Sequence, residues 1–127
     1  MNDAKETVQS PLFRALANVT FESVMVTEAG NDPKDSVVVY VNQAFTELTG
    51  YSADDVLGKT PGVLQGPETD KAVTDRLADD LKNHRTFHGS TINYRKDGSP
   101  FRIEWKVTPV LDGTDVTHYV AVQRAAE

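Results

Sequence analysis

The three histidines are the side chains of this sequence best suited to holding a metal ion or moving a proton, and they are His84, His88 and His118. A catalytic zinc site usually takes two histidines at short spacing together with a carboxylate, as in the HExxH motif. None of the three histidines stands in such a pattern. We therefore expect no metal site and place all three on the surface or at strand edges.

Two pairs of adjacent carboxylates are the candidates for acid–base catalysis, namely Asp54-Asp55 and Asp79-Asp80. A catalytic carboxylate needs burial or a close charge to shift its pKa, and both pairs fall in polar, helix-like segments. The first pair is better explained as favourable charge near a helix N-terminus, and the second as part of a solvated helix face. The sequence therefore predicts no catalytic residue and a chain that is not an enzyme.

The run Gly58-Lys59-Thr60 matches the end of a P-loop, which would bind nucleotide phosphates. That motif needs another glycine five residues earlier, where this chain has Ala53, and a helix directly afterwards, where it has Pro61. A P-loop is therefore a poor interpretation. Thiol chemistry is excluded as well, because the chain contains no cysteine.

The composition is that of an ordinary globular domain. The chain has 127 residues, of which 39% are hydrophobic and 25% charged, so it can bury one core. Its net charge of -6 argues against nucleic acid and anionic membranes as partners, since both attract clustered Lys and Arg. No apolar stretch approaches the roughly 20 residues that cross a bilayer. We expect a single cytoplasmic domain that binds neither nucleic acid nor a membrane.

Residues 1–17 are predicted to form a mobile N-terminal arm and a flanking helix, outside the main domain of residues 18–127. Ser10 is suited to cap this helix and Pro11 to start it. The helix carries an apolar stripe of four residues, namely Leu12, Phe13, Leu16 and Ala17. That stripe needs a partner, which is either the sheet of its own domain or a second chain.

Turn residues divide the rest of the chain into two groups of strands with helices between them. The predicted strands cover 21–27, 36–41, 86–94, 100–109 and a last segment, 110–119, that turns at Asp112-Gly113. The predicted helices follow Asn42 and Ser52, as N-caps, and extend over 70–83. This order defines an α+β fold in which helices pack on one face of an antiparallel sheet.

Four segments of the chain together resemble the PAS family over nearly all of residues 19–124, and they lie at 40–51, 58–70, 93–98 and 108–123. The second segment reads Gly-Lys-Thr-Pro-Gly-Val-Leu-Gln-Gly-Pro-Glu-Thr-Asp. It is similar to the signature of the LOV branch, usually Gly-Arg-Asn-Cys-Arg-Phe-Leu-Gln-Gly-Pro-Glu-Thr-Asp. The resemblance implies a five-stranded antiparallel sheet that encloses a ligand pocket together with its helices.

The resemblance also implies which residues would bind a flavin, either FMN or FAD. Gln65 and Asn93 match positions that hydrogen-bond the flavin in LOV domains, and Gln123 matches the glutamine that rotates its amide when the flavin changes state. The remaining flavin-binding candidates are Thr60, Leu64, Leu77 and Trp105. A carboxamide suits the edge of a heterocycle because it offers both a donor and an acceptor. The alternative is that these amides satisfy neighbouring backbone groups or water.

Several positions depart from the LOV pattern. Pro61 stands where the photoactive cysteine is expected, so a cysteinyl-flavin adduct cannot form. The usual phosphate-binding arginines correspond to Gly62 and Ala78, which removes the bidentate anchor that a phosphate prefers. Lys71 or Arg76 could substitute, although both are better explained as solvated helix charges.

The strand over 101–107 alternates strictly between apolar and charged residues. Its apolar set must face the core, and it includes Ile103, where LOV domains carry a second flavin-binding asparagine, and Trp105. An inward indole can stack on a planar ligand or fill the cavity itself. The sequence favours complete or partial filling.

The sequence as a whole predicts a sensory or regulatory PAS domain of a signalling protein that cannot form a cysteinyl-flavin adduct and that senses redox state or a small ligand. The alternative is a ligand-free module for dimerisation or protein interaction. Under both hypotheses we expect a homodimer that forms through the N-terminal helix and the open sheet face. The effector domain is not visible in this sequence.

Overall fold

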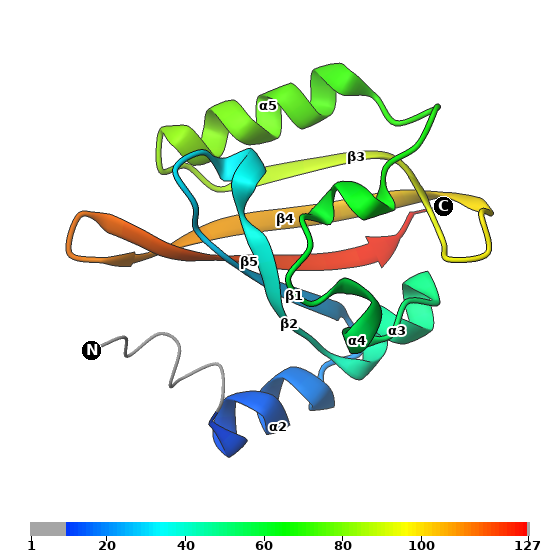
Figure 1. The fold of residues 1–127 in the computed structure, drawn as a ribbon, viewed down its shortest axis with the longest axis horizontal. Helices are drawn as coiled ribbons and strands as arrows, with labels where there is room; N and C mark the ends of the chain where they lie inside the picture. The colour runs from blue at the N-terminus through cyan, green and yellow to red at the C-terminus, as the bar shows by residue number, and fades with distance from the viewer. Residues whose placement is uncertain (1–9, 127) are drawn as a thin grey trace.

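Five antiparallel strands form a single sheet in the order β2-β1-β5-β4-β3 (Figure 1). The computed structural model describes residues 10–126, so the predicted N-terminal arm lies outside the described residues apart from Ser10. The strands are β1 (Ser23–Glu28), β2 (Val37–Val41), β3 (Phe87–Tyr94), β4 (Pro100–Asp112) and β5 (Asp115–Ala125). The predicted α+β fold with a five-stranded antiparallel sheet is confirmed.

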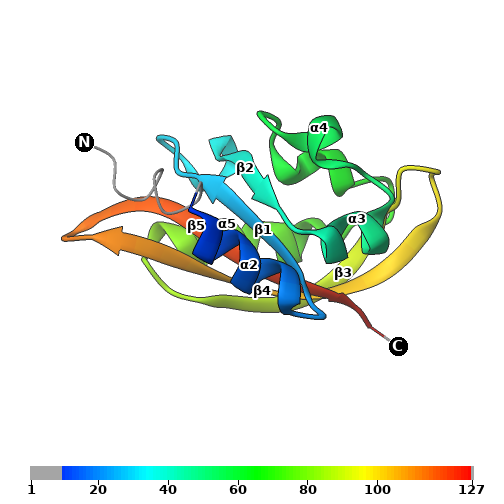
Figure 2. The same cartoon turned by 90° about the horizontal axis from the view of Figure 1, so that it is seen from below.

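The helices of the described part lie on both sides of this sheet. They are α2 (Pro11–Val19), α3 (Gln43–Thr49), α4 (Ala53–Val56) and α5 (Lys71–Lys82), with 3₁₀ helices η1 (Pro33–Asp35) and η2 (Pro61–Leu64). Figure 2 shows α2 on the face opposite to α5. The sequence predicts only loop at η1 and η2, because three or four residues carry no helical period. No described helix is long and apolar enough to cross a membrane.

Side chains cap four helices, and the caps at Ser10, Asn42 and Ser52 are those that the sequence predicts. The four caps are Ser10, Asn42, Ser52 and Asp70, and each accepts a hydrogen bond from a backbone N–H in the first turn of its helix. Helix α3 ends at Gly50, which adopts the left-handed conformation with φ 79° that favours glycine. Because a cap is a contact between residues only a few positions apart, the local sequence is sufficient to place these helix starts.

The inner face of the sheet carries the main core, under α3, α4 and α5. Along β4, Phe101, Ile103, Trp105 and Val107 are buried, whereas Arg102 and Lys106 point outward and are exposed, as the alternation predicts. Phe45 of α3 and Phe87 of β3 are almost completely buried in the same cluster. Burial of these large aromatic side chains removes much apolar surface from water and so stabilises the fold.

The outer face carries a second, smaller cluster under α2. Ala17 of α2 packs there with Val24, Val26 and Tyr40, and the Phe13 ring meets the Tyr40 ring edge-on at a centroid distance of 5.1 Å. One side of the apolar stripe of α2 is therefore covered by the sheet of its own domain. The other side faces solvent.

Candidate ligand-binding site

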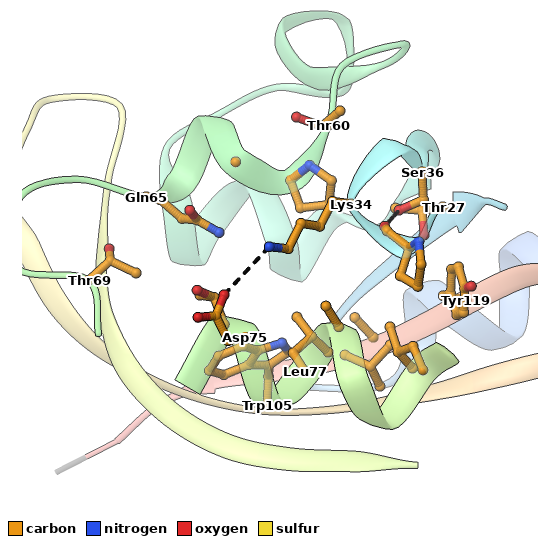
Figure 3. A pocket seen from close by; sticks show the side chains of 18 of the residues that line it. Thr27, Lys34, Ser36, Thr60, Gln65, Thr69, Asp75, Leu77, Trp105 and Tyr119 are labelled. Carbon is orange, nitrogen blue, oxygen red and sulfur yellow. Dashed lines mark hydrogen bonds and ion pairs between the residues drawn. The ribbon is translucent and has the colours of Figure 1, made fainter. Parts of the chain in front are cut away.

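A cavity of about 480 Å³ lies between the inner face of the sheet and the elements that cover it (Figure 3). Residues of β1, β4 and β5 line one side, and residues of η1, η2, the following loop and α5 line the other. This volume is within the range of about 300–1,000 Å³ that is usual for small-molecule sites. The cavity is therefore large enough for a ligand.

The apolar walls of the cavity come from Trp105 on β4, Tyr119 on β5 and Leu77 and Leu81 on α5. The Trp105 ring also packs against the Phe87 ring, with the centroids 4.9 Å apart and the planes tilted by 53°. The indole therefore forms a wall and leaves the space open. Complete filling of the cavity by Trp105, one of the outcomes that the sequence favours, is wrong, because a cavity of about 480 Å³ remains with Trp105 in its wall.

Four of the seven flavin-binding candidates line the cavity, namely Thr60, Gln65, Leu77 and Trp105. The other three, Leu64, Asn93 and Gln123, are buried close by without lining it. Figure 3 shows Thr60 and Gln65 on the side of η2, facing Leu77 and Trp105 across the space. The structure thus places a carboxamide and an indole on opposite sides of one cavity.

The amide of Gln123 is held by a neighbouring strand. Ser23 Oγ of β1 donates a hydrogen bond to Gln123 Oε1 of β5 at 2.9 Å, and both residues are buried. The partner of this oxygen is thus a side chain, and is not a backbone group. Any rotation of the Gln123 amide would have to break the bond to β1.

Among the described residues that line the cavity, three carry a charge, namely Lys34, Lys71 and Asp75. Lys71 Nζ lies 2.9 Å from Asp75 Oδ2, and Lys34 Nζ lies 3.5 Å from Asp75 Oδ1. The hydrogen bond from Lys71 and then the ammonium of Lys34 hold the pKa of Asp75 below its usual value. All three side chains are about half exposed or more, so they lie where the cavity meets solvent, as do the exposed residues Thr60 and Gln65.

The positions that the resemblance assigns to phosphate contacts also line the cavity. Gly62 and Ala78 lie in its wall together with Pro61, and none of them carries a charge. Arg76 does not replace them, because its guanidinium lies 4.7 Å from the Phe87 ring centroid and donates to the backbone carbonyl of His88. Lys71 is exposed, as expected for a solvated helix charge, yet it also contributes to the cavity wall.

The second half of the 58–70 loop is fastened to β3. Gly66 lies against Tyr94 so closely that a Cβ atom there would clash with the tyrosine ring. The hydroxyl of Thr69 donates to the Ile92 carbonyl at 2.6 Å, and the Tyr94 hydroxyl accepts from the Glu68 N–H at 2.9 Å. These residues of the signature therefore hold the loop on the sheet and do not themselves need a ligand.

The histidines do not converge on a site. His88 Nε2 lies 2.6 Å from Glu104 Oε2 on the exposed outer face of the sheet, and His84 is also exposed. His118 is buried, with no hydrogen-bond partner for Nδ1 in the described structure, so its predicted place on the surface is wrong. The reason is that β5 is a central strand, with β1 and β4 on either side. In residues 10–126 no group of three or more His, Asp or Glu side chains could hold a metal ion.

Sequence reasoning missed several residues of the cavity wall. Lys34, Ser36 and Thr27 come from the β1–β2 hairpin and its connecting segment, and Tyr119 comes from β5. These residues lie outside the loop that carried the sequence resemblance, and no local pattern marks them. The pairing of β1 with both β2 and β5 is what brings them to the cavity.

Residues 22–124 match the family model described as PAS domain, and the chain belongs to this family. It is 36% identical over 111 residues to Phototropin-2 of Oryza sativa subsp. japonica, which covers 87% of this chain and 12% of that protein. It is 39% identical over 104 residues to blue-light-activated histidine kinase 1 of Erythrobacter litoralis, which covers 73% of this chain and 29% of that protein. The chain thus spans less than a third of the length of these two relatives.

Solved structures of LOV domains share the fold. The chain superposes with a TM-score of 0.82 and 30% identity on a structure described as "Flavin Analogue Sheds Light on Light-Oxygen-Voltage Domain Mechanism", covering 94% of this chain and 87% of that one. For the LOV domain of a blue-light-activated histidine kinase from Erythrobacter litoralis the TM-score is 0.75 at 31% identity, covering 82% and 94%. The chain is a PAS domain of the LOV-like branch.

The cavity can be tested for its fit to a flavin. Its volume is sufficient, Trp105 and Leu77 offer apolar surface to a planar ring, and Gln65 offers a donor and an acceptor to the ring edge. Ile103 gives no polar contact, and it is buried outside the cavity lining. The residues therefore fit the ring with fewer polar contacts than the resemblance implies.

Proposed function

We propose that this chain is a sensory domain that holds a flavin in the cavity and responds to it without a cysteinyl adduct. The observation that carries the proposal is the cavity of about 480 Å³ with Gln65 and Trp105 in its walls, in a chain of the LOV-like branch. The chain has no cysteine, so no thiol of its own can react with a flavin. When bound, a flavin supplies reversible uptake of electrons, which would make redox state or photoreduction the signal.

Each residue has a separate role in this proposal. Gln65 would hydrogen-bond the edge of the ring, and Trp105 and Leu77 would pack against its faces. Gln123 would transmit a change in the state of the flavin to β1, because its amide oxygen already accepts a hydrogen bond from Ser23 on that strand. Support for that path is the burial of both side chains, which leaves the amide few other partners. Asn93, Leu64 and Thr60 stay candidates for the remaining contacts.

The chain itself is proposed to have no catalytic activity. The charged groups of the cavity are exposed enough to be solvated, and the buried groups around it are amides, hydroxyls and hydrocarbons. Catalytic acids and bases are typically buried or placed beside a charge that shifts their pKa. An output activity would therefore belong to another part of a longer protein or to a partner. The cytoplasmic location, the domain boundary after residue 17 and the absence of nucleic-acid and membrane binding stay predictions.

The absorbance spectrum of the purified chain, before and after incubation with FMN, tests the flavin. We expect a structured blue band that stays with the protein through gel filtration and does not bleach irreversibly in blue light. Protein that stays colourless after incubation with FMN would remove the flavin from the proposal.

The variant Pro61→Cys gives a sharper test of where the ring lies. If the flavin occupies the cavity beside position 61, a thiol there should restore reversible bleaching of the blue band in light. The matched control is Ser90→Cys, which places a thiol on the exposed outer face of β3. Bleaching in neither variant, despite bound flavin, would place the ring away from η2.

A second candidate function is homodimerisation through α2, favoured by the exposed side of its apolar stripe. Leu12 and Leu16 are 71% and 62% exposed, and Phe21, just after the helix, is fully exposed. Two further apolar side chains are exposed nearby in the fold, namely Val19 at the end of α2 and Val122 on the outer face of β5. Apolar side chains that gather on one face are typical of protein interfaces.

Light scattering at several protein concentrations tests the dimer. We expect Leu16→Glu to convert a dimer into a monomer, because a carboxylate in an apolar interface has no partner. Gln43→Glu, an exposed change of the same charge on α3, is the control and should leave the dimer intact. A wild-type chain that is monomeric at all concentrations would contradict this function. The flavin proposal would be unaffected by that result.

A further inference from the structure

The charged side chains that line the cavity have a net positive charge, opposite in sign to the net charge of the whole chain. The chain carries a net charge of -6, whereas the cavity wall holds two ammonium groups, Lys34 and Lys71, and one carboxylate, Asp75. Asp32, on the same connecting segment as Lys34, is paired with Lys82 at 3.2 Å, and neither of these two residues lines the cavity. The wall therefore has an excess of positive charge in an acidic protein.

The two lysines come from elements on either side of the opening. Lys34 belongs to η1, and Lys71 is the first residue of α5. Figure 3 shows the Lys34 side chain extending between the loop that carries Thr60 and Gln65 and helix α5, where it meets Asp75. A negatively charged group that reached this opening from inside the cavity would meet both ammonium groups.

Asp75 can give up its ion pairs at little cost. Its partners are 60% and 83% exposed, and ion pairs between exposed side chains contribute little to stability. Two ammonium groups share this single carboxylate, so one of them lacks a full counter-charge. A phosphate could take that place, since lysine binds phosphate as a flexible point charge.

We propose that Lys34 and Lys71 bind the phosphate of the cavity ligand, so that this domain takes a phosphorylated flavin in preference to a neutral one. This inference rests on the proposed function, since it requires a flavin ring in the cavity. It assigns the phosphate contact to η1 and to the start of α5, and it gives Asp75 the role of a competing anion that the ligand displaces.

Titration of the chain with FMN and with riboflavin, followed by quenching of flavin fluorescence, tests the assignment. We expect the wild-type chain to bind FMN about fivefold more tightly than riboflavin at low salt. In the double variant Lys34→Gln/Lys71→Gln the two affinities should become equal, with riboflavin affinity unchanged. Asp75→Asn should raise the preference for FMN about threefold, because it removes the competing carboxylate.

Lys82→Gln is the matched control. Lys82 joins the same connecting segment to the same helix through Asp32, but it lies outside the cavity lining. This variant should keep the wild-type preference for FMN. The preference itself should shrink when salt is raised from about 0.05 M to about 0.5 M, since exposed charges are screened.

The possible results distinguish failure of the phosphate assignment from failure of the flavin site itself. Flavin binding with equal affinities for FMN and riboflavin in the wild-type chain would overturn the phosphate assignment and leave the flavin site in place. A preference for FMN that survives in the double variant would overturn it as well. If neither flavin binds a chain that melts cooperatively, the proposed flavin function itself fails, and the phosphate assignment fails with it.

Discussion

The inner face of the sheet buries Phe87, Ile103 and Trp105 under α3, α4 and α5, whereas the outer face buries a small cluster under α2 alone. Both faces are made by the same strands, because successive side chains point to opposite sides. The inner face therefore provides most of the core and also the cavity. The outer face leaves apolar surface on α2 and a polar surface on β3, β4 and β5.

The polar part of the outer face is a small charge network across three strands. Glu104 of β4 lies 2.6 Å from His88 of β3 and 2.8 Å from Arg124 of β5. The hydrogen bond from His88 and then that from Arg124 hold the pKa of Glu104 below its usual value. Because both partners of Glu104 are exposed, the network contributes little to stability. The inner face therefore stabilises the domain, whereas the outer face remains available for contacts with other molecules.

Truncation of one phenylalanine on each face is the strongest test of this comparison. Phe87 is completely buried on the inner face, and Phe21 is fully exposed beyond α2. We expect Phe87→Ala to lower the free energy of unfolding by about 3–5 kcal/mol, because it opens a cavity beside Trp105. Phe21→Ala should change it by less than about 0.5 kcal/mol. Urea unfolding measures both, and similar losses in the two variants would contradict the comparison.

Asn42 connects the two faces and gives the next largest effect. Its Oδ1 accepts from the N–H groups of Val24 and Phe45, and its Nδ2 donates to the carbonyls of Ala17 and Glu22. It is buried, so Asn42→Ala would leave backbone groups of α2, β1 and α3 without partners. We expect a loss of about 2–4 kcal/mol in the free energy of unfolding.

Ser52→Ala is the matched control for Asn42→Ala. Ser52 also caps a short helix, but its hydrogen bonds with Asp55 are exposed. The expected loss is about 0.5–1 kcal/mol, as for an ordinary cap. Equal losses in the two variants would show that Asn42 acts only as a cap and does not couple the faces.

Asp55 of α4, on the inner side of the sheet, gives the smallest predicted effect. The backbone N–H of Ser52 and then the ammonium of Lys96 lower the pKa of Asp55 to about 2. Its folded pKa lies below the unfolded value of about 3.9. The stability it contributes is therefore complete above about pH 4 and is lost as the pH falls through about 2.

The urea midpoint measured from about pH 5 down to about pH 2 checks this effect. It should fall more steeply with decreasing pH in the wild-type chain than in Asp55→Asn. Asp54→Asn is the control, since its carboxylate makes no hydrogen bond among the described residues. If the slopes of all three proteins agree, the contact between α4 and Lys96 does not contribute to stability.

The 58–70 loop illustrates how far a sequence signature can be interpreted. Its second half identifies the family correctly, yet Gly66 and Thr69 serve to attach the loop to β3. These requirements are structural, so they persist whatever the cavity binds. The residues that would decide the ligand are others, namely Thr60 and Gln65 of the loop and residues of other elements, including Lys34. A matching signature therefore predicts the fold more securely than the ligand.

The helix starts at Ser10, Asn42 and Ser52, the alternation along β4 and the lack of a thiol can all be derived from the sequence alone. These features depend on contacts within three or four residues, or on composition alone, so they can be derived without the fold. The tertiary structure alone decided that His118 is buried, that Trp105 forms a wall of an open cavity and that Lys34 meets Asp75 across 41 positions of sequence. Such contacts follow from strand order and from the packing of α5 on the sheet, which no local pattern specifies.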